Sequence, residues 1–169
     1  MFIAIVQHTP VWVWGLLAAL VALGLSQART RDISLTRITV LPLILLTLSV
    51  SGVLSAFGHL PIAIAAWIGG VAAALGLGRR AVAVQGAWWS AGTRQLRVPG
   101  SWLPLVLIVG LFMIKYMAGA SLALHPSLAT DSLFAGLCSL AYGTFSGLFL
   151  ARALSLRSLA VRPSTLQAA

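Results

Sequence analysis

The sequence predicts an all-α integral membrane protein, a bundle of five transmembrane helices. Three observations predict this class: 60% of the 169 residues are hydrophobic, only 8% are charged, and five apolar stretches are long enough to cross a bilayer. The mean hydropathy is +1.02. A soluble domain of this length needs more charge to cover its surface, whereas a bilayer core of ~30 Å needs about 20 apolar residues per helix. We therefore expect residues 1–169 to form one membrane domain.

The five predicted spans are separated by connections that leave little room for a separate soluble domain. They comprise residues 7–26, 37–57, 60–78, 102–124 and 132–153. A secretory signal peptide carries basic residues before its apolar core, and "MFIAIVQHTP" contains none. The first stretch is therefore predicted to be a retained helix.

The ten arginines predict the orientation of the bundle. They lie between spans one and two, between spans three and four, and after span five, whereas the N-terminal segment and the loops 57–61 and 125–131 contain no Lys or Arg. Because basic residues concentrate on the cytoplasmic side, we expect the N-terminus outside and the C-terminus in the cytoplasm. Arginines that flank membrane spans account for the net charge of +9, so no nucleic-acid partner is expected.

The longest connection, about residues 80–100, predicts a short cytoplasmic surface hairpin between the third and fourth helices. β-Branched and aromatic residues flank a Ser-Ala-Gly turn there. Aromatic and basic side chains are expected to anchor the hairpin at the lipid headgroups, and docking of a cytoplasmic partner is the alternative. These anchors are Trp88, Trp89, Trp102, Arg94 and Arg97.

Small residues provide the packing signal inside a bilayer, because they let helix backbones approach closely. The fifth span carries Gly143-x-x-x-Gly147, with Gly136 and Ser139 at near-helical spacing before it, and the first and third spans are also rich in Gly and Ala. These faces predict either a tight bundle or the seam of a homo-oligomer. They also suit a membrane-protein partner.

One residue breaks the charge pattern. Lys115 is the only lysine in the chain, and it lies near the middle of the fourth span. A lysine at that depth costs about 2.5–3.5 kcal/mol on insertion scales and usually has a role. Its natural partner is a carboxylate, yet the only two acids, Asp32 and Asp131, fall in loops on opposite sides of the predicted membrane.

Neutral polar groups are the expected surroundings of Lys115. They are Tyr142, Ser139 and Ser146 on the fifth span and Thr47, Ser51 and Ser55, which follow one face of the second span. Three alternatives remain for the amine: it is neutral, a bound anion supplies the missing charge, or the side chain extends toward the membrane surface and serves packing. The leading functional hypothesis is an intramembrane pocket around Lys115 that binds or permeates a small molecule or anion.

Two other functions stay open. A non-catalytic accessory or scaffold subunit would use the small-residue faces and the hairpin. A metal or redox protein would use His8, His59 and His125, which all fall on the predicted outer side, although no local ligand spacing is present and interfacial hydrogen bonding is the simpler explanation. Cys138 is expected to be an inert apolar residue. No nucleophile, phosphate-loop or dinucleotide motif indicates an enzyme or a cofactor.

Five strings, taken together, resemble an uncharacterised family of small multi-pass inner-membrane proteins of proteobacteria, a domain of unknown function. They are "HTPVWVWGLLAAL" (8–20), "TRDISLTR" (30–37), "VPGSWLPL" (98–105), "KYMAGASLA" (115–123) and "AYGTFSGLFLARAL" (141–154). The resemblance covers most of the chain and implies a multi-pass protein of the bacterial inner membrane with this helix arrangement. It implies no activity and no functional residues.

Overall fold

The structure is a computed structural model, and it describes residues 10–78, 82, 88–90 and 95–161. The described part contains five α-helices, one short 3-10 helix and three short strands. In chain order these are α2 (Val11–Ser26), β1 (Arg31–Ser34), α3 (Leu35–Phe57), α4 (Pro61–Gly76), β2 (Trp88–Ser90), β3 (Gln95–Val98), α6 (Leu103–Leu124), η1 (Pro126–Thr130) and α7 (Ser132–Val161).

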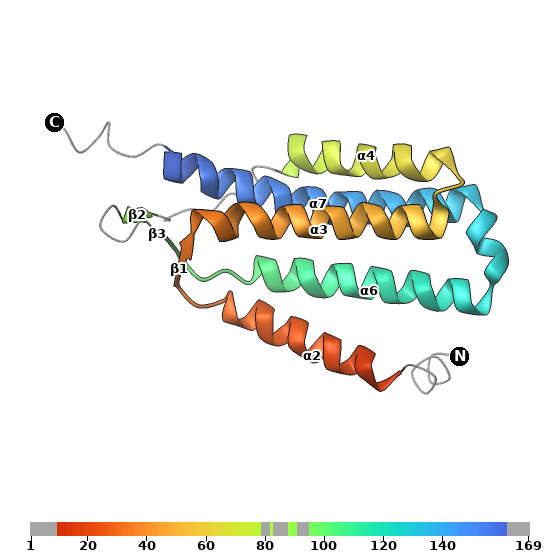
Figure 1. Ribbon diagram of the computed structural model, residues 1–169, viewed down its shortest axis with the longest axis horizontal. Helices are drawn as coiled ribbons and strands as arrows, with labels where there is room; N and C mark the ends of the chain where they lie inside the picture. Colours follow the sequence, from red (N-terminus) through yellow and green to blue (C-terminus); the bar gives the residue numbers. More distant parts are fainter. Residues whose placement is uncertain (1–9, 79–81, 83–87, 91–94, 162–169) are drawn as a thin grey trace.

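The helices lie side by side along the long axis of the molecule (Figure 1). Three of them are long and apolar enough to cross a membrane over Ile38–Phe57, Leu103–Leu124 and Ser132–Ser158. The helices α2 and α4 are apolar but shorter, with 16 residues each. The three strands lie at one end of the molecule, and η1 and the α3–α4 connection lie at the other (Figure 1). The predominantly helical fold was predicted. A hairpin was predicted between the third and fourth spans, but the third strand of the sheet, β1, was not.

Helices α3, α4 and α7 form a first layer, with α7 at its centre. The small residues of α7 bring it into backbone contact with α4. A Cβ atom at Gly143 would collide with the carbonyl oxygen of Trp67, and one at Gly70 would collide with that of Leu140. A Cβ at Gly147 would stand 2.7 Å from the Cβ of Ala74. Helix α3 packs beside these two helices, against α7 more than against α4. The Gly-x-x-x-Gly pattern is therefore used inside the chain, as tight helix packing requires.

Helices α2 and α6 form a second layer. A Cβ at Gly24 of α2 would overlap Leu105 of α6, and a Cβ at Gly110 of α6 would lie 2.7 Å from the ring of Phe145 on α7. By contrast, α2 and α3 do not pack against each other to a comparable extent, and neither do α3 and α6. The two layers therefore meet through α6 and α7 and separate toward α2 and α3.

The sheet covers one end of both layers. Its strand order is β1-β3-β2, and both pairings are antiparallel. Ile33 of β1 and Leu96 and Val98 of β3 are buried with Ile38 and Leu156, so one face of the sheet packs on the ends of α3 and α7. This core ties the strands to the bundle.

The other face of the sheet carries the charges. Arg97 Nε lies 4.0 Å from Asp32 Oδ1, and both side chains are about half exposed, so this ion pair contributes little to stability. The predicted hairpin corresponds to β2 and β3, whose Trp88 and Arg97 are paired in register. Residues 91–94 between them lie outside the described part. Strand β1 was missed, because "RDIS" was interpreted only as part of a polar connection.

Some small residues that the sequence suggests for packing have no neighbour in the described part of the chain. A Cβ at Gly15, Gly69 or Gly76 would meet no atom within 4 Å. Gly69 and Gly76 are exposed on α4, on the surface that α7 does not cover. Their use in a homo-oligomer seam stays a prediction.

Replacing Gly143 by Ala tests the α4–α7 contact. The added Cβ collides with the Trp67 carbonyl, so we expect Gly143→Ala to lower the free energy of unfolding by roughly 1–3 kcal/mol. Gly69→Ala is the matched control, because it brings the same gain in helix propensity at an open position. Thermal unfolding in one mild detergent measures both variants, and equal stabilities would contradict the packing described here.

Candidate functional site

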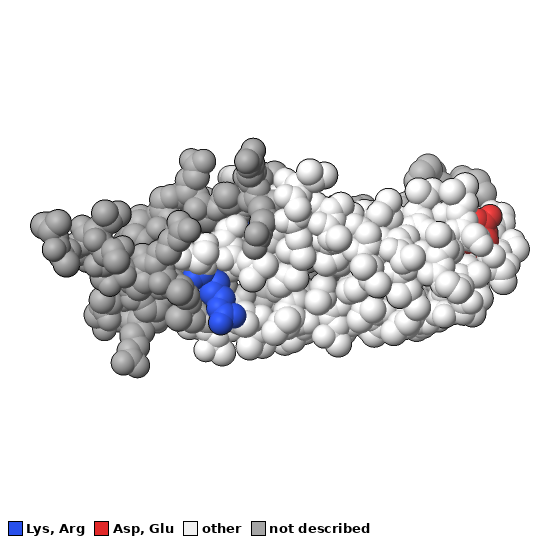
Figure 2. Space-filling model, turned by 90° about the horizontal axis from the view of Figure 1, so that it is seen from above, with Lys and Arg blue, Asp and Glu red and all other residues white. Residues whose placement is uncertain are grey.

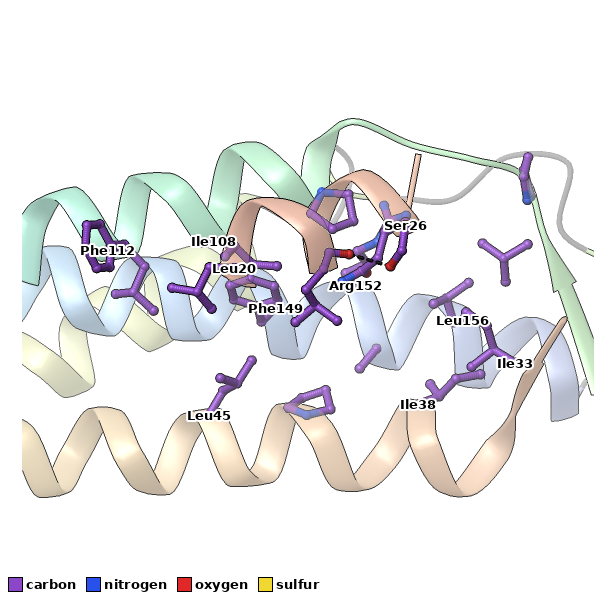
Figure 3. Close-up of a pocket in the computed structure, with 18 of the residues that line it drawn as sticks. Leu20, Ser26, Ile33, Ile38, Leu45, Ile108, Phe112, Phe149, Arg152 and Leu156 are labelled. Carbon is purple, nitrogen blue, oxygen red and sulfur yellow. Dashed lines mark hydrogen bonds between the residues drawn. The ribbon is translucent and has the colours of Figure 1, made fainter. Parts of the chain in front are cut away.

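A pocket of about 610 Å³ lies between the two layers. Its walls come from α2, α3, α6 and α7, and most lining side chains are aliphatic or aromatic. Leu20, Ile108 and Phe149 line its middle (Figure 3). Ile33 and Leu156 line it at the sheet end (Figure 3). The volume falls within the range of roughly 300–1,000 Å³ that is typical of small-molecule sites.

The polar groups of the pocket are few, and the charged ones are cationic. Lys115, Arg152, Ser26 and Gln27 line it, and its lining contains no Asp or Glu. Ser26 Oγ donates a hydrogen bond of 2.6 Å to the carbonyl oxygen of Leu23 within α2. Figure 3 shows Arg152 and Ser26 close together, whereas Phe112 lies farther along the pocket, away from the sheet. An apolar pocket with two cations favours a ligand that has negative charge and an apolar body.

Lys115 is exposed on α6, and its ammonium reaches toward α7 and α3. Its Nζ atom lies 5.1 Å from the ring centroid of Tyr142 on α7, within the range of a cation–π contact. The same atom lies 3.0 Å from the position that a Cβ at Gly52 would occupy on α3. Gly52 therefore leaves the space into which the amine reaches. Tyr142 itself is buried, with 6% of its surface exposed.

Neither carboxylate side chain of the protein is close to Lys115. Asp32 lies in the sheet beside Arg97. Asp131 Oδ1 accepts a hydrogen bond of 2.8 Å from the backbone N–H of Phe134, which caps the start of α7. Tyr142 comes eleven residues after Asp131, so the two lie about 16 Å apart along the helix axis. The protein thus supplies an aromatic face to the amine, but no side-chain anion.

A buried hydrogen-bonded chain holds Tyr142 in place. Trp67 Nε1 on α4 donates to Ser49 Oγ on α3 at 3.1 Å, and Ser49 Oγ donates to the carbonyl oxygen of Tyr142 at 3.4 Å. These contacts join α3, α4 and α7 beside the amine. Sequence reasoning missed Ser49 and Gly52, for which the sequence offers no signal. Sequence reasoning used Arg152 only to predict the orientation of the bundle. The signal that could have linked it to the site is its helical spacing, which places Tyr142, Phe149 and Arg152 on one face of the helix.

The predicted serines of α7 are buried beside this site. Ser139 and Ser146 are 0% and 2% exposed, and their hydroxyl oxygens have no hydrogen-bond partner in the described part of the chain. Neither residue lines the pocket. Their predicted place in the shell around Lys115 stays a prediction.

The predicted hydroxyl face of α3 has partners within its own helix. Thr47, Ser51 and Ser55 are exposed, and their hydroxyls donate to the carbonyl oxygens of Leu43, Leu48 and Gly52 at 3.0–3.1 Å. None of the three lines the pocket. Participation in ligand binding would require these hydroxyls to exchange their backbone partners.

The remaining predicted positions lie away from the pocket. His59 and His125 are exposed near helix ends, His8 lies outside the described residues, and the described residues contain no group of three His, Cys, Asp or Glu placed to hold a metal. Cys138 is a half-buried free thiol.

The predicted interfacial anchors are described only in part. Trp102, immediately before α6, is 64% exposed, and Arg97 is exposed on the sheet. The backbones of Trp88 and Trp89 lie in β2, and Arg94 lies outside the described residues.

These features define a helical protein with membrane-length apolar helices and a cationic pocket between two layers. Residues 1–167 match the family of unknown function DUF6622, and the chain belongs to that family. The uncharacterized protein PM0739 of Pasteurella multocida (strain Pm70) is 41% identical over 51 residues, which cover 30% of this chain and 40% of that relative. No solved structure matches the chain. The predicted resemblance to a family without a known activity is thereby confirmed.

A double-mutant cycle on Ser49 and Trp67 tests the buried chain that positions Tyr142. Ser49→Ala leaves the indole N–H without its acceptor and is expected to cost about 1–3 kcal/mol of stability. Trp67→Phe in the Ser49→Ala background removes that unpaired donor, so we expect a coupling energy of about 0.5–1.5 kcal/mol. Ser55→Ala, which removes an exposed hydroxyl bonded within α3, is the control. Additive effects of the two substitutions would contradict the hydrogen bond.

Proposed function

We propose that this is a multi-pass protein of the bacterial inner membrane whose sheet end faces the cytoplasm. The length and apolar character of α3, α6 and α7 support a membrane location. The distribution of charge supports the orientation, because the described arginines all belong to the sheet end: they lie near the end of α2, in β1 and β3, at the start of α3 and toward the end of α7. Figure 2 displays basic atoms near that end and an acidic group at the opposite end of a long uncharged surface.

Fusions at the C-terminus test this orientation. A green fluorescent protein fused after Ala169 is expected to fluoresce, and alkaline phosphatase at the same place is expected to be inactive, because the fusion point lies in the cytoplasm. Active phosphatase combined with a dark fluorescent fusion would reverse the orientation. In-gel fluorescence and phosphatase assays of membrane fractions, normalised to protein level, give the two readouts.

We further propose that the protein binds a small amphipathic anion in the pocket, with Lys115 as its partner. The observation that carries this proposal is the position of Lys115, which lines an apolar pocket where no side-chain carboxylate reaches it. A cation–π contact contributes about 0.5–2 kcal/mol, less than the roughly 2.5–3.5 kcal/mol that a lysine costs at mid-membrane depth. A bound anion would supply the remaining stabilisation through a charge-assisted hydrogen bond.

The apolar lining of the pocket indicates that the ligand also has an apolar part. Side chains such as Leu20, Ile108 and Phe149 cannot solvate a small hydrated ion, but they match an aliphatic or aromatic body. We infer that such a molecule enters from the bilayer between α2 and α3, which both line the pocket and do not pack tightly on each other. Permeation would use the same site, because Lys115 lies between the two ends of the bundle.

An accessory-subunit function is the second candidate. The observation that favours it is the exposed surface of α4, where Gly69 and Gly76 leave open space for another helix. A stoichiometric partner that co-purifies with the wild-type protein and is lost from Gly69→Leu would support this function.

Replacing Lys115 by Met separates binding from stability. Met is an unbranched side chain, one heavy atom shorter than Lys, and it removes the charge, so the ligand-free variant is expected to be at least as stable as the wild-type protein. We expect native mass spectrometry after mild extraction to show a bound anionic adduct on the wild-type protein and to show its loss from Lys115→Met.

Arg157→Gln is the matched control for that comparison. Arg157 is exposed on α7 outside the pocket lining, so the adduct should persist in this variant. An adduct that survives Lys115→Met, or a wild-type protein without any anionic adduct, would contradict the proposed function.

A further inference from the structure

We propose that the ligand is elongated and carries an acidic group at each end of an apolar chain. One acidic group would bind Lys115, and the other would bind Arg152. This inference rests on the proposed function, and it adds the chemical class of the ligand.

The spacing of the two cations along one pocket is the first argument. The Lys115 amine lies at the level of Tyr142, and Arg152 follows Tyr142 by ten residues on the same helix. At 1.5 Å per residue, the two levels are about 15 Å apart along α7. Both residues line the same continuous pocket, so one extended molecule can reach both of them.

The lining between the cations is the second argument. Leu20, Ile108 and Phe149 lie between Phe112 and Arg152 in the pocket (Figure 3). A charged or strongly hydrated segment would lose its solvation against these side chains without gaining hydrogen bonds. The middle of the ligand must therefore be apolar. A small ion that moved from one cation to the other would lose its hydration against the same side chains.

The chemistry of the Arg152 end is the third argument. A guanidinium keeps its charge, and its planar set of N–H donors matches the geometry of a carboxylate or phosphate. Ser26 and Gln27 add neutral polar groups to the same pocket, and the lining has no Asp or Glu to compete for the arginine. A ligand with a single acidic group would contact only one of the two cations that line the pocket.

Two probes of equal chain length test this inference with the full-length protein in detergent. Hexadecanedioate has a carboxylate at each end, and hexadecanoate has only one. At pH 8, where the carboxyl groups are ionised, we expect the diacid to displace a fluorescent fatty acid at a concentration about tenfold or more lower than the monoacid does, because it gains one more charge-assisted hydrogen bond.

Variants locate the two ends of the probe. Lys115→Gln and Arg152→Gln should each reduce the diacid-to-monoacid preference to about onefold, since each leaves a single cation. Arg152→Lys should keep a preference, and Arg157→Gln should keep all of it, because Arg157 does not line the pocket. The thermal midpoint and the gel-filtration profile of every variant report whether it is folded.

The outcomes distinguish this inference from the proposed function. Equal displacement by the two acids in the wild-type protein, with both lost in Lys115→Gln, overturns the two-ended ligand and leaves an anion at Lys115. A diacid preference that persists in folded Arg152→Gln also overturns it. If neither acid displaces the fluorescent fatty acid, the two-ended ligand is overturned. The proposed anion site at Lys115 is tested separately, by the presence of the native adduct on the wild-type protein and its loss from Lys115→Met.

Discussion

The backbone contact between α4 and α7 is the constraint on which the rest of the structure depends. Glycines on both helices remove the side chains that would otherwise hold the two backbones apart. With α4 and α3 packed on it, α7 still has a face for α6. Helix α2 then packs on α6, and the sheet closes one end of both layers. The pocket is the space that remains between the layers.

This arrangement explains why a single lysine is tolerated in an apolar helix. Gly52 leaves room beside the amine, the Tyr142 ring lies within cation–π distance, and the Trp67–Ser49 hydrogen bonds fix the helix segment that carries the tyrosine. The protein places an aromatic face beside the charge, and the lysine also lines the pocket. An empty pocket would leave the charge only partly compensated, and a bound anion would complete the compensation.

The sequence predicted the predominance of helices, because long apolar stretches and the Gly-x-x-x-Gly pattern act locally. It also singled out Lys115 and Tyr142, since a lysine in an apolar helix is unusual by composition alone. It missed β1, whose pairing with β3 joins segments far apart in the chain, and it missed Ser49, Gly52 and Arg152. Their relation to Lys115 depends on how three helices are rotated about their own axes, which periodicity does not specify. For the same reason Thr47, Ser51 and Ser55 were expected around the amine, whereas their hydroxyls bond within α3.

The central claim, an anion bound at Lys115, can be measured directly because the chain contains one lysine. Lysine labelled with ¹⁵N at Nζ gives a single side-chain amine signal from the protein in reconstituted bilayers. With hexadecanedioate labelled with ¹³C in its carboxyl groups, the account predicts a through-space dipolar contact between that nitrogen and a carboxyl carbon. The same contact should persist in Arg157→Gln, because Arg157 does not line the pocket. An amine signal that contacts only water, and neither the carboxyl carbon at saturating acid nor any phosphorus, would contradict the account.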